Sequence, residues 1–459
     1  MKNNEKLHEE CGVFGVWNAD QSQASHDIYT GLVALQHRGQ EAAGIAVCDT
    51  YGEKGNIALR KDMGLVTEVF DEETLSNKLI GNIGIGHVRY STTGGSFIEN
   101  AQPLVYHYLK GTLALVHNGN IVNCNQLKEE MFEAGDVFQA TTDTEVIAHL
   151  IAKKRAETGS IQEAVKMAAP KLIGGYALII MSPRKLVVVR DPLGLKPLCI
   201  GKSANGWVVA SESCALSAVG AEFVRDVEPG EILSISRRGL ISDKSMCCKT
   251  QAHCVFEYIY FARLDTKMDG ISIYGARFRG GQALADAYPV DADIVAGVPE
   301  SGMTAAAGYA YQAGIPFVHA FHKNSYIGRT FIKPTQKERE NAVHMKLSVL
   351  EDAVRGKKIV LIDDSIVRGT TIANLIRMLR EAGAEAVHVR ICSPPFLYPC
   401  FYGTDVPDNT QLIANRMSTQ QICQQIGADS LGYMRIEDFP RMTGELPLCR
   451  ACFDGVYPT

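Results

Sequence analysis

The feature that most constrains this chain is a run of thirteen residues, IVLIDDSIVRGTT (359–371). Its apolar beginning predicts a buried strand, which ends at two acids, Asp363 and Asp364. Gly369 and the two threonines after it begin a helix, whose free backbone N–H groups form an anion site. The carboxylates are unsuited to phosphate but suit sugar hydroxyls or a bridging Mg²⁺. The run therefore indicates a site for a phosphorylated sugar, although an acidic pair alone would more often cap a turn.

The segments around this run alternate between strands and helices. The strand in DADIVAGVPESG (291–302) precedes an alanine-rich helix, MTAAAGYAYQAG (303–314), and the strand EAVHVRIC (385–392) follows the helix IANLIRMLREAG (372–383). In that last helix Gly383 is placed to cap the C-terminus. Its apolar face consists of Ile372, Leu375, Ile376 and Leu379. This rhythm predicts a parallel sheet covered by helices.

The first half of the chain alternates short apolar segments with helical stretches. The expected strands are CGVFGVW (11–17), IGIGHVRY (83–90), TLALVHNG (112–119), YALIIM (176–181), KLVVVRD (185–191) and GWVVAS (206–211). The expected helices are HDIYTGLVALQHRG (26–39), TDTEVIAHLIAKKRAETG (142–159) and SIQEAVKMAAPKLIG (160–174). Two sheets sandwiched between helices fit this alternation. A polar, aromatic-poor break follows at residues 235–252, and we place the domain boundary at residue 240.

Composition limits the classes of function. The 459 residues correspond to about three domains of ~150 residues, or to two large ones. The net charge of −5 argues against a broad nucleic-acid surface, and no apolar stretch approaches the ~20 residues of a membrane span. The polar start MKNNEKLHEE lacks the apolar core of a signal peptide, so we expect a cytoplasmic protein. Its 13 cysteines are then thiols, metal ligands or catalysts rather than disulfides.

The run 359–371 resembles the 5-phosphoribosyl 1-pyrophosphate (PRPP) motif of type I phosphoribosyltransferases. The resemblance places GVPESG (297–302) near the pyrophosphate and gives a Mg²⁺ site of Ser301, Asp363 and Asp364. The segment 323–346 is rich in Lys and Arg; it is either a solvated surface or, by the resemblance, a lid over PRPP. The implied PRPP-binding residues are Asp363, Asp364, Ser365, Arg368, Gly369, Thr370, Thr371, Arg329 and Lys346.

A cysteine near an N-terminus is usually a small buried hydrophobe, but Cys11 has informative partners. They are LQHRGQEAAGI (35–45), GHVRYSTTG (86–94), VHNGNIVN (116–123) and TDTEVIAHLI (142–151). Together these segments resemble the glutaminase domain of N-terminal-nucleophile amidotransferases. With the PRPP motif, essentially the whole chain resembles the glutamine phosphoribosylpyrophosphate amidotransferase family, also called amidophosphoribosyltransferases.

This resemblance implies the fold and the reaction. The fold would be a four-layer αββα glutaminase (11–240), followed by an α/β phosphoribosyltransferase domain with a cluster-binding tail (241–459). Ammonia from L-glutamine would be transferred to PRPP, giving 5-phosphoribosylamine, glutamate and pyrophosphate, the first committed step of purine (IMP) synthesis. The resemblance further implies one Mg²⁺ per subunit, feedback inhibition by purine nucleotides, and a homotetramer. No nucleic-acid or membrane partner is expected.

The glutaminase chemistry needs a nucleophile, a base and an oxyanion site. A chain-terminal cysteine supplies both a thiol and, as base, its own α-amine of pKa ~8. That amine exists only if the Glu10–Cys11 bond is cleaved, so residues 1–10 would be a propeptide. By resemblance, Asn118 and the Gly119 N–H form the oxyanion hole, Arg89 holds the α-carboxylate of glutamine, and Asp143 receives its α-ammonium. Two structural alternatives stay open: Asn118-Gly119 also suits a hairpin turn, and Asp143 a helix cap.

The cysteines of the second half indicate a metal centre. Cys449 and Cys452 form a CxxC pair, which zinc, redox chemistry or chance can produce. One pair with two distant single cysteines, Cys254 and Cys400, favours iron–sulfur over structural zinc. The contexts resemble the amidotransferase class that carries a propeptide and one [4Fe–4S] cluster per subunit. Three other cysteines are alternative ligands: Cys392, Cys247 and Cys248. We assign the rest to packing: Cys48, Cys124, Cys199, Cys214 and Cys423.

Two rival functions are weighed against this hypothesis. A glutaminase with another acceptor, as in glucosamine-phosphate synthase or asparagine synthetase, does not call for a PRPP loop. A PRPP-binding regulator keeps the loop but predicts a DNA-binding segment at the N-terminus, where the glutaminase motifs stand instead.

Overall fold

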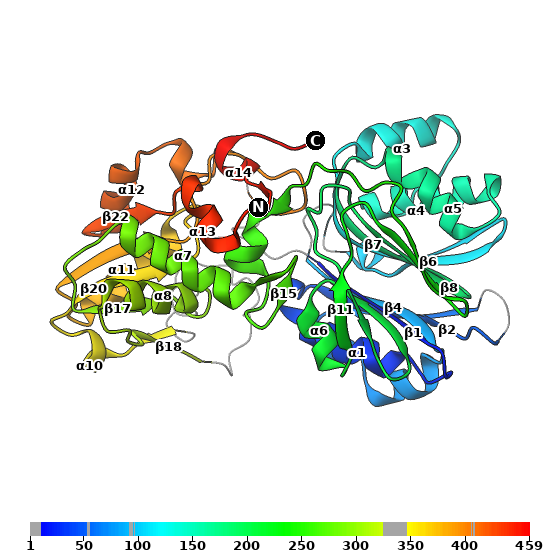
Figure 1. Ribbon diagram of the computed structural model, residues 1–459, viewed down its shortest axis with the longest axis horizontal. Coiled ribbons are helices and arrows are strands. Elements are labelled where there is room, and N and C mark those ends of the chain that lie inside the picture. The colour runs from blue at the N-terminus through cyan, green and yellow to red at the C-terminus, as the bar shows by residue number, and fades with distance from the viewer. Residues whose placement is uncertain are drawn as a thin grey trace.

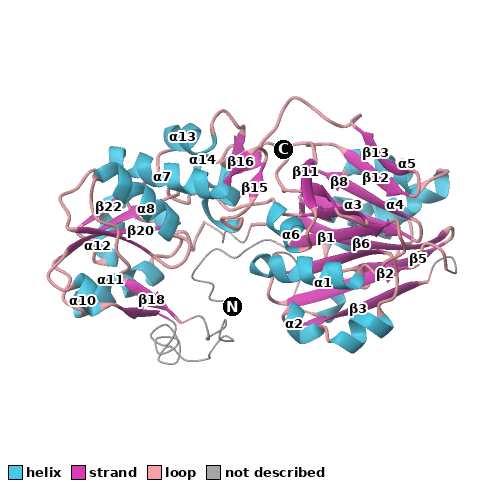
Figure 2. Cartoon of the chain, turned by 60° about the horizontal axis from the view of Figure 1, so that its bottom comes forward, coloured by secondary structure: helices cyan, strands magenta, loops and turns pink. Residues whose placement is uncertain are grey.

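The computed structural model describes residues 11–52, 56–90, 95, 97–324, 347–404, 406 and 409–459. The first half of the chain, blue to green in Figure 1, forms one lobe, and the second half, green to red, forms the other. The last residues lie between the two lobes in both views (Figures 1 and 2). Among the described helices, none is long and apolar enough to cross a membrane.

The first lobe contains two antiparallel sheets that pack face to face. The order of the seven-stranded sheet is β11 (Glu222–Asp226), β9 (Cys199–Lys202), β10 (Gly206–Ala210), β1 (Gly12–Asn18), β4 (Ile83–Arg89), β2 (Ala42–Cys48), β3 (Ile57–Met63). The order of the six-stranded sheet is β13 (Gly239–Asp243), β12 (Ile232–Ser236), β8 (Lys185–Arg190), β7 (Gly174–Ser182), β6 (Gly111–Ile121), β5 (Leu104–Tyr108). Buried apolar residues from both sheets, such as Val13 and Ile179, form one core between them.

Helices cover the outer face of each sheet. On the seven-stranded sheet these are α1 (Ser25–Ala34), α2 (Val66–Val69) and α6 (Ser213–Ala218). On the six-stranded sheet these are α3 (Cys124–Glu133), α4 (Asp143–Glu157) and α5 (Ile161–Ala168). Helix α5 begins at a capping box, in which Ser160 and Glu163 satisfy each other's backbone N–H groups. The predicted four-layer αββα arrangement is confirmed.

The second lobe is built on a parallel sheet, as predicted. Its order is β17 (Ile294–Gly297), β20 (Lys358–Asp363), β21 (Ala386–Ile391), β22 (Ser430–Tyr433). One face packs against α7 (Ile273–Ala287), α8 (Met303–Ala313) and α13 (Phe439–Thr443). The other face packs against α11 (Thr370–Glu381) and α12 (Thr419–Ile426), and α10 (Glu351–Val354) lies near it. The apolar face predicted for α11 is buried.

Short ladders complete the second lobe. They pair β14 (His253–Cys254) with β23 (Leu448–Cys449), β15 (Lys267–Met268) with β16 (Ile271–Ser272), and β18 (Phe321–Lys323) with β19 (Leu347–Val349). Two further elements lie against the first lobe: the π-helical turn η5 (Glu257–Phe261), through the contact of Glu257 with Arg38, and α14 (Ala451–Asp454), which lines a cavity together with Leu195. Since β13 pairs with β12, the first lobe's sheet extends to Asp243, past the expected boundary at residue 240.

Candidate active sites

Cys11 lies at the start of the central strand of the seven-stranded sheet. Gly12 of β1 is opposite Val88 of the antiparallel strand β4, which puts Cys11 level with Arg89. The half-buried Cys11 thiol lies 3.4 Å from the carbonyl oxygen of Tyr90. The expected propeptide, residues 1–10, lies outside the described residues. The residue before β1 is thus presented at a sheet edge beside the end of β4.

Arg89 and Asn118 come from different sheets, and a histidine pair joins their strands. His87 Nε2 of β4 lies 3.1 Å from the carbonyl oxygen of His117 in β6. Because a carbonyl only accepts, this nitrogen carries the proton; burial lowers the pKa of His87 to about 3, so its ring is neutral. Arg89, two residues beyond His87, is buried and donates to the Gly95 carbonyl at 3.3 Å. This contact brings Arg89, the candidate for binding the α-carboxylate of glutamine, and Asn118, the candidate for binding the oxyanion, to the same edge of the two sheets.

Asn118 and Gly119 lie within β6, where Asn118 pairs with Ala177 and Gly119 with Tyr176 of β7. The alternative of a hairpin turn at these residues is therefore wrong. The Asn118 side chain is fully buried, and within the described ranges neither its amide nitrogen nor its oxygen has a hydrogen-bond partner. Gly119 has φ +139°, and a Cβ there would lie 2.0 Å from the Gly175 carbonyl oxygen. Only glycine fits this strand position, and the buried amide beside it is available to a ligand.

Asp143 is the first residue of α4, but it does not cap the helix. Thr142 does so, because its hydroxyl accepts from the Thr144 N–H at 2.9 Å. The alternative role of Asp143 as a cap is therefore wrong. Its carboxylate accepts from the Ile121 N–H at 2.9 Å and lies 3.4 Å from His117 Nδ1. Burial raises the pKa of Asp143, but His117 and the backbone N–H groups outweigh it and hold the pKa below its usual value. A buried carboxylate thus remains ionised next to the histidine that adjoins Asn118.

The second candidate site lies at the carboxyl edge of the parallel sheet. Gly297 of β17 is opposite Ile362 of β20, so the loops that follow both strands meet at this edge. Ser301 Oγ lies 3.4 Å from Asp363 Oδ1, which joins two of the predicted Mg²⁺ ligands. A cavity of about 280 Å³ adjoins the loop, lined by Asp363, Ser365, Ile366, Val367, Gly369, Thr371 and Ile372.

Polar residues of the loop line this cavity at both ends, Asp363 and Ser365 where β20 ends and Thr371 in α11, while Asp364 and Thr370 are their neighbours in sequence. Gly369 has φ +87° and stands just before α11, so the N–H groups of Thr370 and Thr371 fall in the helix's first turn. Asp364 Oδ2 accepts from Ser365 Oγ at 2.5 Å, while Asp364 Oδ1 is buried with no partner among the described residues. An anion-binding helix start and a carboxylate oxygen without a partner suit a phosphorylated sugar.

Some predicted PRPP residues are placed differently or not at all. Arg368 donates to the Gln411 side chain rather than to the loop. Arg329, Lys346 and the rest of the predicted lid, residues 325–346, lie outside the described residues, as does 91–94 of the segment GHVRYSTTG.

The four cysteines predicted as cluster ligands line a single cavity of about 450 Å³ between the lobes. Cys254 pairs with Cys449 in the short parallel ladder β14–β23, and Cys452 follows in α14. Cys400 comes from a loop after β21, where its Sγ accepts from the Tyr402 N–H at 3.4 Å. The structure thus brings together three segments that are far apart in sequence.

The cavity removes two of its thiols from water. Burial, followed by the neighbouring thiols, raises the pKa of Cys452, and burial raises the pKa of Cys449 to about 12. Buried thiolates need a metal beside them. In the described part of the chain, no three His, Cys, Asp or Glu side chains gather closely enough to hold a single metal ion. The four cysteines thus line one cavity, although no group close enough to hold a metal ion is found among the described residues.

The alternative ligands do not line this cavity. Cys392 is buried near Asp363 and Asp364, which together with burial raise the pKa of its thiol. Cys248 is exposed and contacts the Pro192 carbonyl oxygen. Lys196, which the sequence reasoning missed, is buried at the cavity wall. The sequence signal that could have revealed its burial is that Lys196 is the single charged residue in the apolar stretch LGLKPLCI (193–200).

A thiol beside two facing sheets, and a phosphate loop on a parallel sheet, define a glutamine amidotransferase joined to a phosphoribosyltransferase. A family model described as "Glutamine amidotransferase domain" matches residues 87–218, and one described as "Phosphoribosyl transferase domain" matches residues 281–393. The amidophosphoribosyltransferase of Bacillus subtilis is 47% identical, covering 99% of this chain and 95% of its own, so the chain belongs to the amidophosphoribosyltransferase family. Enzymes of this family use glutamine and PRPP in the first step of purine biosynthesis, and this chain is such an enzyme.

The relatives match over the full length. The amidophosphoribosyltransferase of Methanocaldococcus jannaschii is 47% identical, covering 98% of this chain and 98% of its own. The structure of the glutamine PRPP amidotransferase from Bacillus subtilis, complexed with ADP and GMP, matches with a TM-score of 0.90 at 46% identity, covering 98% of this chain and 97% of that chain. A structure described as the allosteric regulatory enzyme of purine biosynthesis matches with a TM-score of 0.91 at 46% identity, covering 98% and 96%.

Proposed function

We propose that Cys11, once it is the first residue of the mature chain, is the nucleophile that releases ammonia from glutamine. Its thiol attacks the amide carbon of glutamine while its own α-amine takes the thiol proton. The C–N bond then breaks as the amine passes this proton to the leaving nitrogen, which releases ammonia and leaves a thioester on Cys11. Water hydrolyses the thioester to glutamate and restores the thiol. The Asn118 amide and the Gly119 N–H donate to the developing oxyanion. Arg89 pairs with the α-carboxylate of the substrate, and Asp143 with its α-ammonium. The buried, ionised Asp143 supports these assignments, as does the Asn118 amide, which has no hydrogen-bond partner in the part of the chain that the structure describes.

In the second lobe, the proposed acceptor is PRPP at the loop 363–371. Thr370 and Thr371 bind the 5-phosphate at the start of α11, together with Ser365, Arg368 and Gly369. Asp363 and Asp364 bind the ribose hydroxyls, and with Ser301 they would hold Mg²⁺, which when bound screens the pyrophosphate charge. Arg329 and Lys346 are proposed as the cations that neutralise the negative charge of the departing pyrophosphate.

The observation that carries the two-site proposal is a contact between the lobes at the oxyanion strand. Asn120 Nδ2 of β6 donates to the carbonyl oxygen of Phe401 at 2.8 Å. A Cβ built on Gly403 would lie 3.0 Å from the Gly119 carbonyl carbon. The loop 401–403 of the second lobe therefore packs directly beside the residue proposed to bind the oxyanion. Ammonia released there would lie next to the second lobe, and a short path between the two sites would limit its protonation by bulk water.

A single preparation tests the nucleophile. The purified, active protein should begin at Cys11 when its N-terminus is sequenced, and its intact mass should lack residues 1–10. A diazoketone analogue of glutamine should label Cys11, as mapped by peptide mass spectrometry. An active protein that still begins at Met1, or one that releases no ammonia from glutamine, would contradict the proposal.

We further propose that Cys254, Cys400, Cys449 and Cys452 hold a [4Fe–4S] cluster. The cavity that the four cysteines share supports it, and bound iron would stabilise the thiolate form that burial alone disfavours. The amide and PRPP chemistry needs no electron transfer, so the cluster would join β14, the loop at Cys400 and the C-terminal segment. Anaerobically purified protein should be brown, with about four irons and four sulfides per chain. Stoichiometric zinc without visible absorbance would contradict it.

The remaining partners are proposed on the family membership. Purine nucleotides would inhibit, in keeping with the ADP and GMP in the Bacillus subtilis complex, and the enzyme would be a cytoplasmic homotetramer with one Mg²⁺ per active site. Sedimentation of the pure protein and inhibition assays with purine nucleotides test these points.

A further inference from the structure

A buried arginine contacts the backbone of the proposed nucleophile. Arg38 ends the short 3-10 helix η1 (Gln36–Arg38), and its side chain is completely inaccessible to solvent. Its Nε donates to the carbonyl oxygen of Cys11 at 3.2 Å. The direction of this guanidinium therefore helps to set the orientation of Cys11, and with it the positions of the α-amine and the thiol.

Two buried carboxylates hold the Arg38 guanidinium, and one of them belongs to the second lobe. Glu257 of η5 accepts from both terminal nitrogens, at 3.0 Å from Nη1 and 2.5 Å from Nη2. Glu212, which precedes α6 in the first lobe, accepts from Nη1 at 2.6 Å. Burial raises the pKa of Glu212, but His37 and Arg38 outweigh it and hold the pKa well below its usual value. The fork of two bonds to Glu257 fixes the plane of the guanidinium.

The position of Glu257 is fixed within the second lobe. Arg277 of α7 is buried and donates to the carbonyl oxygens of Tyr258 at 3.1 Å and Ala262 at 2.7 Å, which clamps both ends of η5. Further along, the Arg263 N–H donates to Glu212 at 2.9 Å. The turn that carries Glu257 is thus held against the first lobe.

We propose that Glu257 is a positioning residue of the glutaminase site, supplied by the phosphoribosyltransferase lobe. It orients Arg38, whose Nε then fixes the Cys11 carbonyl and so aims the amine and thiol at the substrate. The first lobe's active site is incomplete without this carboxylate. The inference rests on the proposed role of Cys11. Because small displacements of a reacting group lower rates strongly, the expected effect is on turnover rather than on glutamine binding.

The test compares Glu257→Gln with the unaltered full-length, processed enzyme. Glutamine can accept only one of the two guanidinium N–H bonds, so the plane of Arg38 is released. We expect kcat for glutamine hydrolysis to fall at least about tenfold, with KM for glutamine within about threefold. Labelling of Cys11 by the diazoketone analogue should slow in parallel. Synthesis from added ammonia at high pH should stay within about twofold.

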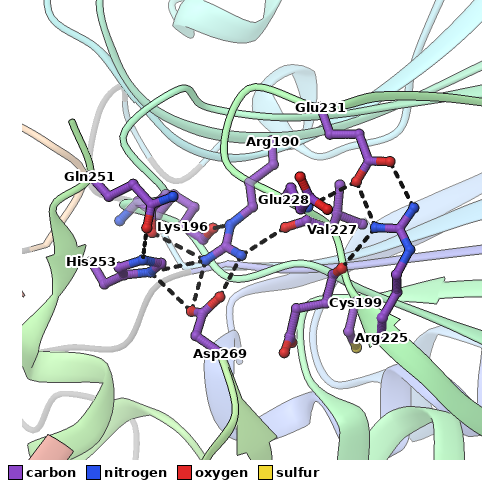
Figure 3. A network of polar contacts seen from close by, with 12 residues as sticks. Arg190, Lys196, Cys199, Arg225, Val227, Glu228, Glu231, Gln251, His253 and Asp269 are labelled. Carbon is purple, nitrogen blue, oxygen red and sulfur yellow. Dashed lines mark hydrogen bonds and ion pairs between the residues drawn. The ribbon is translucent and has the colours of Figure 1, made fainter. Parts of the chain in front are cut away.

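Another buried ion pair between the lobes supplies a matched control. Figure 3 shows Arg190 of β8 facing Asp269 of the second lobe, with Nη1···Oδ1 at 2.7 Å and Nη2···Oδ2 at 2.9 Å. This pair has the same fork geometry, but no contact of it with Cys11 or Arg38 is seen among the described residues. Asp269→Asn should lower the melting temperature while leaving kcat for glutamine hydrolysis within about twofold.

The outcomes separate cleanly. The inference is overturned if kcat for glutamine hydrolysis in Glu257→Gln stays within twofold of the unaltered enzyme. It is also overturned if Asp269→Asn loses as much of this kcat as Glu257→Gln does, or if Glu257→Gln loses as much ammonia-dependent synthesis as glutamine hydrolysis. If Glu257→Gln does not fold, Arg38→Lys replaces it in the test. Lysine keeps the positive charge but cannot bridge the Glu257 carboxylate and the Cys11 carbonyl. The same changes in kcat are expected for this variant, and the same results overturn the inference. If the unaltered enzyme is not labelled at Cys11, the proposed nucleophile fails instead.

Discussion

The two candidate sites of this chain are assembled in opposite ways. In the first lobe, two facing sheets bring together four residues from separate elements: Cys11 directly before β1, Arg89 of β4, Asn118 of β6 and Asp143 of α4. In the second lobe, one strand–loop–helix unit supplies most groups, and Ser301 joins from the neighbouring loop. A site built on one short unit depends on local geometry, whereas a site built across sheets depends on the packing of the whole lobe.

The difference extends to how the polar groups are satisfied. Asp143 is buried and bonded within the first lobe to Ile121 and His117. Asp364 in the second lobe keeps one carboxylate oxygen without a partner among the described residues. Of these two carboxylates, the one in the first lobe is therefore held by its scaffold, whereas the one in the second lobe keeps an oxygen for the substrate, as the Asn118 amide does in the first site. Substitutions that separate the two sites test this contrast.

The largest effect is expected for Cys11→Ala. Without the thiol no covalent intermediate forms, so glutamine-dependent synthesis should fall by about 10³ or more. Synthesis from added ammonia at high pH should persist, because the second lobe is untouched. Both rates are measured by pyrophosphate release, with Cys48→Ala, a buried thiol elsewhere in the first lobe, as the control. Loss of the ammonia-dependent reaction in folded protein would contradict the separation of sites.

Asn118→Ala should rank second. Removing one oxyanion donor lowers kcat by about 10²–10³. Since the buried amide makes no hydrogen bond within the described ranges, the melting temperature should change little. Asn123→Ala is the converse control, because Asn123 bonds to Lys171 and Ile173, and its loss should lower stability and leave kcat unchanged. Equal effects of the two variants on kcat would argue against an oxyanion role.

Asp364→Asn should lower both glutamine- and ammonia-dependent synthesis by about 10–10², because both reactions share the acceptor site. Basal glutamine hydrolysis should survive. Asp291→Asn removes a surface carboxylate that pairs with Lys358 at the opposite end of β20, and it should leave both rates unchanged. If Asp364→Asn affected only the glutamine-dependent rate, the loop would not be the common acceptor site.

The smallest effect concerns stability where the lobes meet. Burial, followed by the charge of Asp269, raises the pKa of Asp226 to about 6. In the unfolded chain this carboxyl ionises near pH 4. The loss of folding stability caused by its burial is therefore absent below pH 4, grows between about pH 4 and 6, and is complete above pH 6. Asp226→Asn should therefore stabilise the protein at pH 7.5 by up to about 3 kcal/mol, with little gain near pH 4.

Denaturant unfolding at the two pH values measures this difference. Asp62→Asn, on the exposed face of β3, is the control and should show no such dependence. A gain for Asp226→Asn that is the same at both pH values would contradict the assigned pKa.

The cysteines mark the limit of sequence reasoning most clearly. The spacing of Cys449 and Cys452 predicted a metal centre, and the resemblance supplied Cys254 and Cys400 as partners. Only the parallel pairing of β14 with β23 and the loop after β21 explain how these thiols reach one cavity. The local preference of Asn118-Gly119 even favours a hairpin turn, and only the pairing with β7 shows that both residues lie within β6.

By itself, the sequence determined the fold of each lobe and the phosphate loop. Hydrophobic periodicity, turn residues and the thirteen-residue run act over short distances along the chain, so they can be interpreted without coordinates. Only the tertiary structure decided which groups meet across the sheets and between the lobes. Arg38 and Glu257 lie 219 positions apart, yet they share two hydrogen bonds in a place without solvent. Their pairing follows from burial, because a guanidinium removed from water requires a carboxylate beside it, and nothing local to either residue specifies which one.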